Sequence, residues 1–331
     1  MTDTQAPVSP TTAQIPRPES GWAALTDRVI IRVSGTGTDP FLQGQFSQNL
    51  AEVVPGYSPR AAAANPKGRA YCLTRMVREG DDILLDLPAA LADGTLAHLQ
   101  KYLMLFRGTS ASIESESRIL GLFGTDAASV LAGDRLPELK APGDTLEIKE
   151  GCLIRVEPTA EGLPRFELWC LTGAIEFANL QEHSLADWQA TEVAAGVAIL
   201  SPATQEEFVP QMLNWQHLGG VHFKKGCYTG QEVIARMHFL GQLKKSLFRF
   251  ALNDAATAPT PGSALLAGDR SVGTVVNAIQ YENGRCELLA VVRHDADVKA
   301  LRAEDAPDHS LEPLPLPYAV TEQTPPARTD T

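Results

Sequence analysis

The sequence predicts an α+β protein in which ferredoxin-like βαββαβ portions precede a small antiparallel β-barrel or sandwich. Three observations support this class. Strand-like and helix-like segments alternate, and hairpin-like turns join many of them. No G-x-G-x-x-G follows a strand and no phosphate-binding P-loop motif occurs, which disfavours a doubly wound nucleotide fold. After residue 240 the chain reads as successive strands, with an Asn-Gly hairpin signal at 283–284.

The first elements are read from turn residues and apolar spacing. A strand over 28–35 ends at glycine, and a helix follows that begins near Asp39 and Pro40 and carries apolar residues up to Leu50. Two extended runs share 61–88, with turns at 65–68 and 79–82. Residues 89–105 place leucines on one helical stripe and are predicted to form a helix.

The middle of the chain continues the alternation. We predict strands at 110–115, 118–124, 152–158 and 165–173, a short helix at 125–133, and a further helix at 174–183. In "VIARMHF" (233–239), apolar residues alternate with Ile234, Arg236 and His238, which predicts a strand. Further strands are expected at 246–252, 271–280 and 285–294.

These elements suggest four regions. We predict disordered tails at 1–20 and 319–331, because both are polar and proline-rich. An α+β region of two intertwined subdomains fills 21–240, and the C-terminal barrel fills 241–318.

Composition limits the class of protein. Hydrophobic residues make up 44% and charged residues 21% of the 331 residues, as in soluble globular proteins. No apolar run approaches the roughly 20 residues of a membrane helix, and the N-terminus lacks the pattern of a secretory signal, so we expect a cytoplasmic protein with no membrane contact. The five widely spaced cysteines argue for a reducing compartment, and the lack of C-x-x-C predicts no metal-binding site within the chain.

The charge is unevenly distributed. A net charge of −12 makes the chain a poor general nucleic-acid binder, so we expect no direct nucleic-acid partner. Residues 221–250 nevertheless contain six lysines and arginines and one glutamate, a local charge of +5. This stretch is either a solvated strand face or a site for an anionic ligand.

The stretch "FKKGCYTGQE" (223–232) contains the main candidate, Cys227. A lone cysteine is most often a small buried apolar residue. Here, however, Gly226 and Gly230 indicate a tight loop, Lys224 and Lys225 would stabilise a thiolate, and the segment has no apolar periodicity. We therefore interpret Cys227 as a functional thiol.

Other residues have both a structural and a functional interpretation. Histidines 217, 222 and 238 flank the loop, and a Cys–His pair for acyl transfer would use one of them, although no third orienting residue can be chosen. Lys67 and Gly68 form a basic turn before a strand. Trp188 either packs in the core or forms a stacking wall for a planar heterocycle.

At the level of motifs, the segment "FKKGCYTGQEVIARMHFLGQLKKSLF" (223–248) resembles the signature of the YgfZ-type folate-binding proteins. These are relatives of the glycine cleavage T-protein, an aminomethyltransferase. The pattern K-G-C-Y-x-G-Q-E with a following A-R is matched from Lys225 to Arg236. Weaker matches are "FLQGQFSQNL" (41–50), Lys67-Gly68, "FVPQMLNWQHLGGVHF" (208–223) and "GTVVNA" (273–278), so the resemblance spans about 22–318.

The resemblance implies a three-part T-protein-like architecture around a central opening that binds folate (tetrahydrofolate), with Cys227 near its rim. It implies a role in the assembly or repair of iron–sulfur proteins of the [4Fe–4S] type, with a transient cluster contact, iron–sulfur client or assembly proteins as partners, and indirect support of tRNA modification. By resemblance, the folate-binding residues are Trp188, Lys67, Gln231 and Arg236, and the residues that support the thiolate or an anionic ligand are Lys224, Lys225, Tyr228 and Glu232.

Two departures from the family pattern keep alternatives open. The first predicted strand has no carboxylate after Asp27, and Ala194 stands where relatives have a glutamate. Three hypotheses follow: an accessory factor that acts through the thiolate of Cys227, a tetrahydrofolate-dependent aminomethyltransferase, and a non-catalytic scaffold with a structural cysteine.

Overall fold

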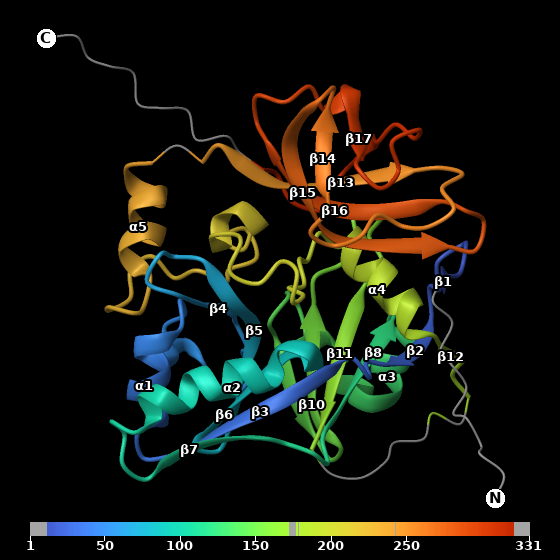
Figure 1. Cartoon of the computed structure of the whole chain (residues 1–331). Helices are drawn as coiled ribbons and strands as arrows, with labels where there is room; N and C mark the ends of the chain where they lie inside the picture. Colours follow the sequence, from blue (N-terminus) through green and yellow to red (C-terminus); the bar gives the residue numbers. More distant parts are fainter. Residues whose placement is uncertain (1–11, 172–176, 178, 242, 321–331) are drawn as a thin grey trace, which may run out of the picture.

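The computed structural model describes residues 12–171, 177, 179–241 and 243–320. Within them, three mainly antiparallel sheets form three lobes, as Figure 1 shows, with the C-terminal sheet above the other two. The predicted α+β class is confirmed. Strands and helices alternate without forming a parallel doubly wound sheet, because the two parallel pairings among the described strands are short and lie at sheet margins.

The five-stranded sheet builds the first lobe, in the order β4-β5-β6-β3-β7. Helix α2 packs on it through its leucine stripe, as predicted. Helix α1 starts one residue before Asp39, which therefore lies in the first turn and pairs with Arg78. The elements are β3 Arg28–Gly35, α1 Thr38–Gln45, η1 Leu50–Glu52, β4 Arg60–Ala64, β5 Ala70–Glu79, β6 Asp82–Pro88, α2 Ala89–Leu103 and β7 Thr109–Ile113.

The six-stranded sheet builds the second lobe, in the order β12-β2-β8-β11-β10-β9. Because alternate residues of β8 and β11 point to opposite faces, α3 covers one face while α4 and β3 pack against the other. The elements are β2 Gly21–Ala24, β8 Arg118–Phe123, α3 Asp126–Ala132, η2 Gly133–Glu138, β9 Thr145–Ile148, β10 Gly151–Val156, β11 Arg165–Cys170, β12 Glu182–His183 and α4 Leu185–Ala194.

The C-terminal sheet has the order β17-β14-β15-β16-β13-β18, with β1 paired to β15. It curves as a half-barrel, and the closed barrel that we expected is not confirmed, because β17 and β18 end an open ladder of described strands. Its elements and those preceding it are η3 Pro210–Leu213, α5 Gln231–Phe239, β13 Lys245–Leu252, β14 Ala264–Ala267, β15 Arg270–Tyr281, β16 Cys286–Arg293, η4 Val298–Ala300, β17 Leu301–Ala303 and β18 Glu312–Leu314.

The strand predicted at 233–239 is wrong, because this segment is helix α5. Only Ile234, one of the residues assigned to the polar face, is buried. The alternation of apolar residues was therefore coincidental. Glu232 lies in the first turn and Arg236 in the last, so both charges match the helix dipole.

The helix predicted at 174–183 is not found in the described part of that segment. Residues 174–176 and 178 lie outside the described residues, and Glu182–His183 form β12, which pairs with β2. Tertiary pairing at a sheet edge here overrides a helical pattern.

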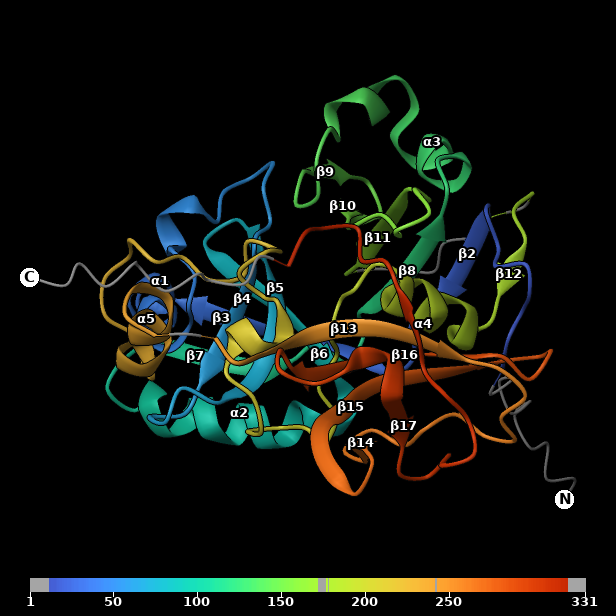
Figure 2. The same cartoon turned by 90° about the horizontal axis from the view of Figure 1, so that it is seen from above.

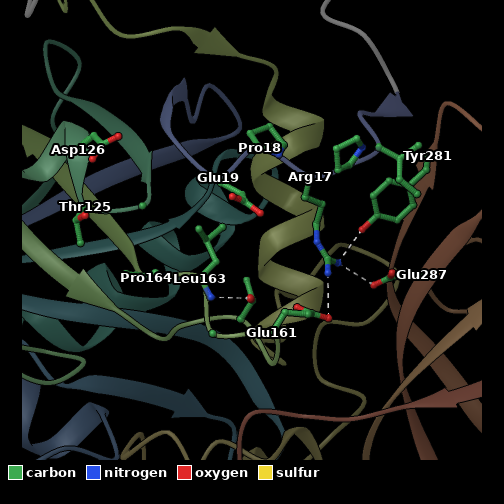
Figure 3. Close-up of a pocket in the computed structure, with 15 residues that line it drawn as sticks. Arg17, Pro18, Glu19, Thr125, Asp126, Glu161, Leu163, Pro164, Tyr281 and Glu287 are labelled. Carbon is green, nitrogen blue, oxygen red and sulfur yellow. Dashed lines mark hydrogen bonds and ion pairs between the residues drawn. The ribbon is translucent and has the colours of Figure 1, made fainter.

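The prediction of a disordered tail through residue 20 is wrong for residues 12–20, whereas residues 1–11 and 321–331 lie outside the described residues. Thr12–Ala13 form β1 beside β15. Arg17 then reaches Glu161 of the second lobe at 2.9 Å and Tyr281 and Glu287 of the C-terminal sheet at 3.0 and 3.2 Å. Figure 3 shows these contacts at the margin of a cavity of about 620 Å³, so the segment ties two lobes together.

Candidate functional site

Cys227 is exposed on the loop between η3 and α5. Its neighbours alternate between solvent and interior: Gly226 is exposed and Tyr228 is buried. The loop is therefore pinned on both sides of a thiol that solvent reaches. A thiol in such a position can react with, or bind to, a second molecule.

Lys225 fixes the loop to helix α1. Its ammonium donates to the carbonyl oxygens of Gln43 at 2.6 Å and Phe46 at 2.5 Å, at the end of that helix. The ammonium also lies 4.8 Å from the centre of the Tyr228 ring. These partners are the electronegative end of a helix and the face of an aromatic ring, which both attract a cation. Burial lowers the pKa of Lys225 to about 7 and raises that of Tyr228 to about 12.

Two glycines dock the loop onto the turn before β5. Gly230 has a φ of +81°, and a Cβ there would lie 2.6 Å from the carbonyl oxygen of Asn65. Gly68 has a φ of +74°, and a Cβ there would lie 2.8 Å from Cβ of Val233. The amide of Thr229 also donates to the carbonyl of Gly44 at 3.1 Å. Two segments far from the loop in the sequence, the end of α1 and the turn before β5, therefore position Cys227.

The structure brings most of the predicted site residues to this place. Lys67 lies exposed on the turn that contacts α5, and Lys224 is exposed beside the loop. Gln231, Glu232 and Arg236 belong to α5 itself. Their proposed roles toward folate or the thiolate stay predictions, as does the role of Tyr228 and Lys225 beyond the contacts just described.

The other four cysteines differ from Cys227. Cys72, Cys170 and Cys286 are buried and Cys152 is half-buried, and all five are free thiols. Burial raises the pKa of Cys72 and Cys152 to about 12 and that of Cys170 and Cys286 to about 11. Buried neutral thiols of this kind pack as small apolar residues.

Trp188 lies apart from the loop, on helix α4. It packs against Gly121, where a Cβ would lie 2.4 Å from the indole ring. The Arg165 guanidinium lies over the same indole ring, 4.2 Å from the ring centre. The side chain is thus a buried core residue. It also lines a cavity of about 190 Å³ together with Asp27, Arg28, Gln189 and Glu192.

A buried network of charges fills the middle of the molecule, and the sequence did not predict it. Arg28 pairs with Asp86 and Glu167, Arg60 and Arg75 pair with Glu157, and Arg165 pairs with Glu192. Four arginines thus face four carboxylates. Burial opposes the ionisation of Glu157, yet the charges of Arg60 and Arg75 outweigh it and hold its pKa well below the ordinary range. The network joins the first and second lobes, and Arg60 also lies over the ring of Trp215 in the segment that follows η3.

Not every atom of this region is satisfied within the described structure. The Oε2 atom of Glu192 and the indole nitrogen of Trp188 are buried and have no hydrogen-bond partner. Both residues line the 190 Å³ cavity, which we call the α4 pocket. Burying an acceptor or a donor that lacks a hydrogen-bond partner costs free energy, unless a further group forms the missing bond. The α4 pocket is therefore a place where the bonding of the described residues is incomplete.

Two sequence signals could have indicated this region. Arg60 directly precedes four alanines, and Arg165 and Glu167 alternate with apolar residues in "RFELWC". Charged side chains in otherwise apolar strands are seldom buried unless paired. Their partners could not be chosen, because pairing joins residues such as Arg60 and Glu157 that lie 97 positions apart.

Across the residues that the structure describes, no three His, Cys, Asp or Glu side chains gather as a metal site. A search of the same residues finds no helix with the length and apolarity needed to cross a membrane.

The three-lobed fold defines the class of protein. The chain is similar to a solved structure of the glycine cleavage system aminomethyltransferase T from Bartonella henselae, with a TM-score of 0.68 over 93% of this chain and 87% of the other. At 18% identity this likeness shows the fold alone. No family model matches the sequence.

The sequence comparison then identifies the family. The chain is 30% identical over 315 residues to the tRNA-modifying protein YgfZ of Enterobacter sp. (strain 638), covering 90% of this chain and 93% of the relative. It is 28% identical to the protein of the same name from Colwellia psychrerythraea, covering 97% and 99%. The chain therefore belongs to the YgfZ family, and the resemblance of its signature segment is confirmed.

Proposed function

We propose that this protein is a folate-binding accessory factor for [4Fe–4S] proteins that supports tRNA modification indirectly. One observation carries the proposal. Cys227 is exposed, while the other four cysteines are buried or half-buried, and two separate segments, the end of α1 and the turn before β5, hold its loop in place. A structural cysteine would need no such fixed and accessible position.

The α4 pocket is suited to the pterin ring of tetrahydrofolate. Trp188 and Glu192 line it, and the Oε2 atom of Glu192, which has no partner among the described residues, would accept a hydrogen bond from a ring N–H group. Ala194 stands where relatives have a glutamate, and Glu192 is the carboxylate that α4 contributes to the lining of this pocket. The pocket admits one bicyclic ring, and the rest of folate would extend outward. When bound, folate supplies a reduced pterin that carries one-carbon units.

Cys227 would act on a partner rather than alone. A [4Fe–4S] cluster takes about four cysteinates, so a single thiolate can contribute one ligand or one redox partner while a client protein supplies the others. In this proposal the cluster is a substrate bound jointly by this protein and its client. The basic residues nearby, Lys67, Lys224 and Arg236, suit an acidic client surface or the glutamate tail of folate.

The test replaces Cys227 by Ala in cells that lack the native protein. We expect the activity of [4Fe–4S] enzymes and the level of a [4Fe–4S]-dependent tRNA modification to fall to those of cells without the protein. The matched control is Cys152→Ala, a half-buried thiol away from the loop, which should support normal levels. Normal activity with Cys227→Ala, at equal protein abundance, would refute a role for this thiol.

A further inference from the structure

The C-terminal segment after β18 crosses the middle of the molecule. Figure 2 shows it in red, running from the C-terminal sheet toward β5. The ring of Tyr318 stacks on His217, with 5.8 Å between ring centres and 19° between planes. Its hydroxyl donates to the carbonyl oxygen of Gly196 at 2.6 Å. An aromatic side chain thus fills a slot with a stacking partner and a hydrogen-bond acceptor.

This slot adjoins the buried charge network. Burial raises the pKa of Tyr318, and the charges of Glu157 and Arg60 act on the same hydroxyl. Arg165 connects these groups to the α4 pocket, because it donates to the carbonyl of Glu157 at 3.1 Å and to Glu192 at 2.6 Å. The slot and the α4 pocket therefore lie on one continuous network.

The segment 315–320 is held mainly by side chains. No backbone-to-backbone hydrogen bond recorded between described residues involves it. Pro315 and Pro317 lack an amide donor, and the Pro315 carbonyl accepts only a long 3.4 Å bond from Arg249. A segment with so few backbone bonds opens at low cost compared with a strand inside a sheet.

Gly196 makes room for the segment. It has a φ of +66°, and a Cβ there would lie 2.6 Å from Leu316 and 2.8 Å from the Tyr318 hydroxyl. At this position, just after α4, a larger residue would be disfavoured both by the positive φ and by the close contact with the segment.

We propose that residues 315–320 form a displaceable strap, in which Tyr318 occupies a slot that the aromatic portion of bound folate would otherwise enter. This inference rests on the proposed folate binding. Closed, the strap keeps water from the charge network; displaced, it opens the network to the ligand. Folate must therefore compete with Tyr318 for the slot. The apparent affinity for folate is the intrinsic affinity multiplied by the fraction of molecules in which the strap is displaced.

The test measures tetrahydrofolate affinity by calorimetry on the full chain and on Tyr318→Ala. Losing one aromatic stack and one hydrogen bond from the closed form should tighten binding about tenfold. Tyr318→Phe keeps the ring and should tighten it less. Truncation after Val320 leaves the strap intact and serves as the matched control, with unchanged affinity. Equal affinity of the wild type and Tyr318→Ala overturns the strap while folate binding stands.

A second readout needs no ligand. In a Trp22→Phe background the three remaining tryptophans are all buried, so acrylamide should quench their fluorescence weakly. Adding Tyr318→Ala should at least double the quenching constant, since Trp215, which lies under Arg60, is two residues from His217, on which Tyr318 stacks. Unchanged quenching overturns the strap. If quenching rises but no variant binds tetrahydrofolate, the strap stands as a closing segment and the proposed folate binding fails.

Discussion

The loop of Cys227 and the central charge network use ionised groups in opposite ways. In the network every arginine faces carboxylates, and four positive charges balance four negative ones. In the loop the buried cation Lys225 is held by carbonyl oxygens and a tyrosine ring. Burying charges that are paired fixes the lobes relative to one another. Burying a cation against neutral acceptors fixes one short loop and leaves the neighbouring thiol exposed.

The comparison indicates that the charge network and the Cys227 loop have different roles. In the proposed function the network and the α4 pocket form the interior in which a ligand would be bound, whereas the loop presents its thiol to solvent. Cys227 and Trp188 both belong to the predicted site, but the structure places them on different elements with different surroundings. Changes in one region should therefore leave the function of the other largely intact.

The largest expected effect is on the network. Arg165→Met leaves Glu192 buried without its cation, which should lower the free energy of unfolding by about 3–5 kcal/mol. Urea denaturation measures this. The matched control is Arg135→Met, because Arg135 pairs with Glu138 on the surface and should show no measurable change. Similar values for the two variants would mean that the network does not hold the lobes together.

A smaller effect is expected where the loop meets the turn before β5. Gly68→Ala adds a positive-φ strain and a clash with Val233, which together should cost about 3 kcal/mol and displace α5. Gly162→Ala, at a φ of +91° with open space around it, should cost only about 1 kcal/mol. The free energies of unfolding of both variants, measured by thermal or urea denaturation, separate the cost of the positive φ from the cost of the clash with Val233. An equal loss in both would show that Gly68 does not dock the loop.

The third expected effect is a pH dependence of stability at Lys225. Because its pKa is lowered to about 7 from 10.5, the unfolded chain binds more protons there between these pH values. Lys225 should therefore make the free energy of unfolding rise with pH across that window. The difference in the free energy of unfolding between wild type and Lys225→Met should grow from pH 7 to pH 10. A flat difference for Lys225→Met would contradict the lowered pKa, and would mean that the partners of the ammonium fully offset its burial.

Local patterns predicted much of the fold. The strand at 28–35, the helix at 89–103 and the hairpins around residues 80 and 283 all follow from periodicity and turn residues. The failures occurred where long-range contacts decide the structure. Residues 233–239 alternate like a strand but lie on the surface with only Ile234 buried, and β12 forms because β2 offers an edge.

The candidate site was predictable to a similar extent. Cys227 and its glycines were visible as a motif, and the contact of Lys67-Gly68 with α5 followed only from the structure. The partners of Lys225 could not be predicted, because backbone carbonyls carry no sequence signal. Glu192 was passed over because its partner Arg165 is in another strand and its free oxygen is a property of the folded packing.

The most direct test of the division between binding interior and reactive loop is calorimetric titration with tetrahydrofolate of the wild type, Cys227→Ala and Glu192→Gln. We expect Cys227→Ala to bind like the wild type, because the thiol lies outside the α4 pocket. Glu192→Gln should bind at least about tenfold more weakly, because it loses a charge-assisted acceptor. Loss of binding in Cys227→Ala, or unchanged binding in Glu192→Gln, would contradict this account.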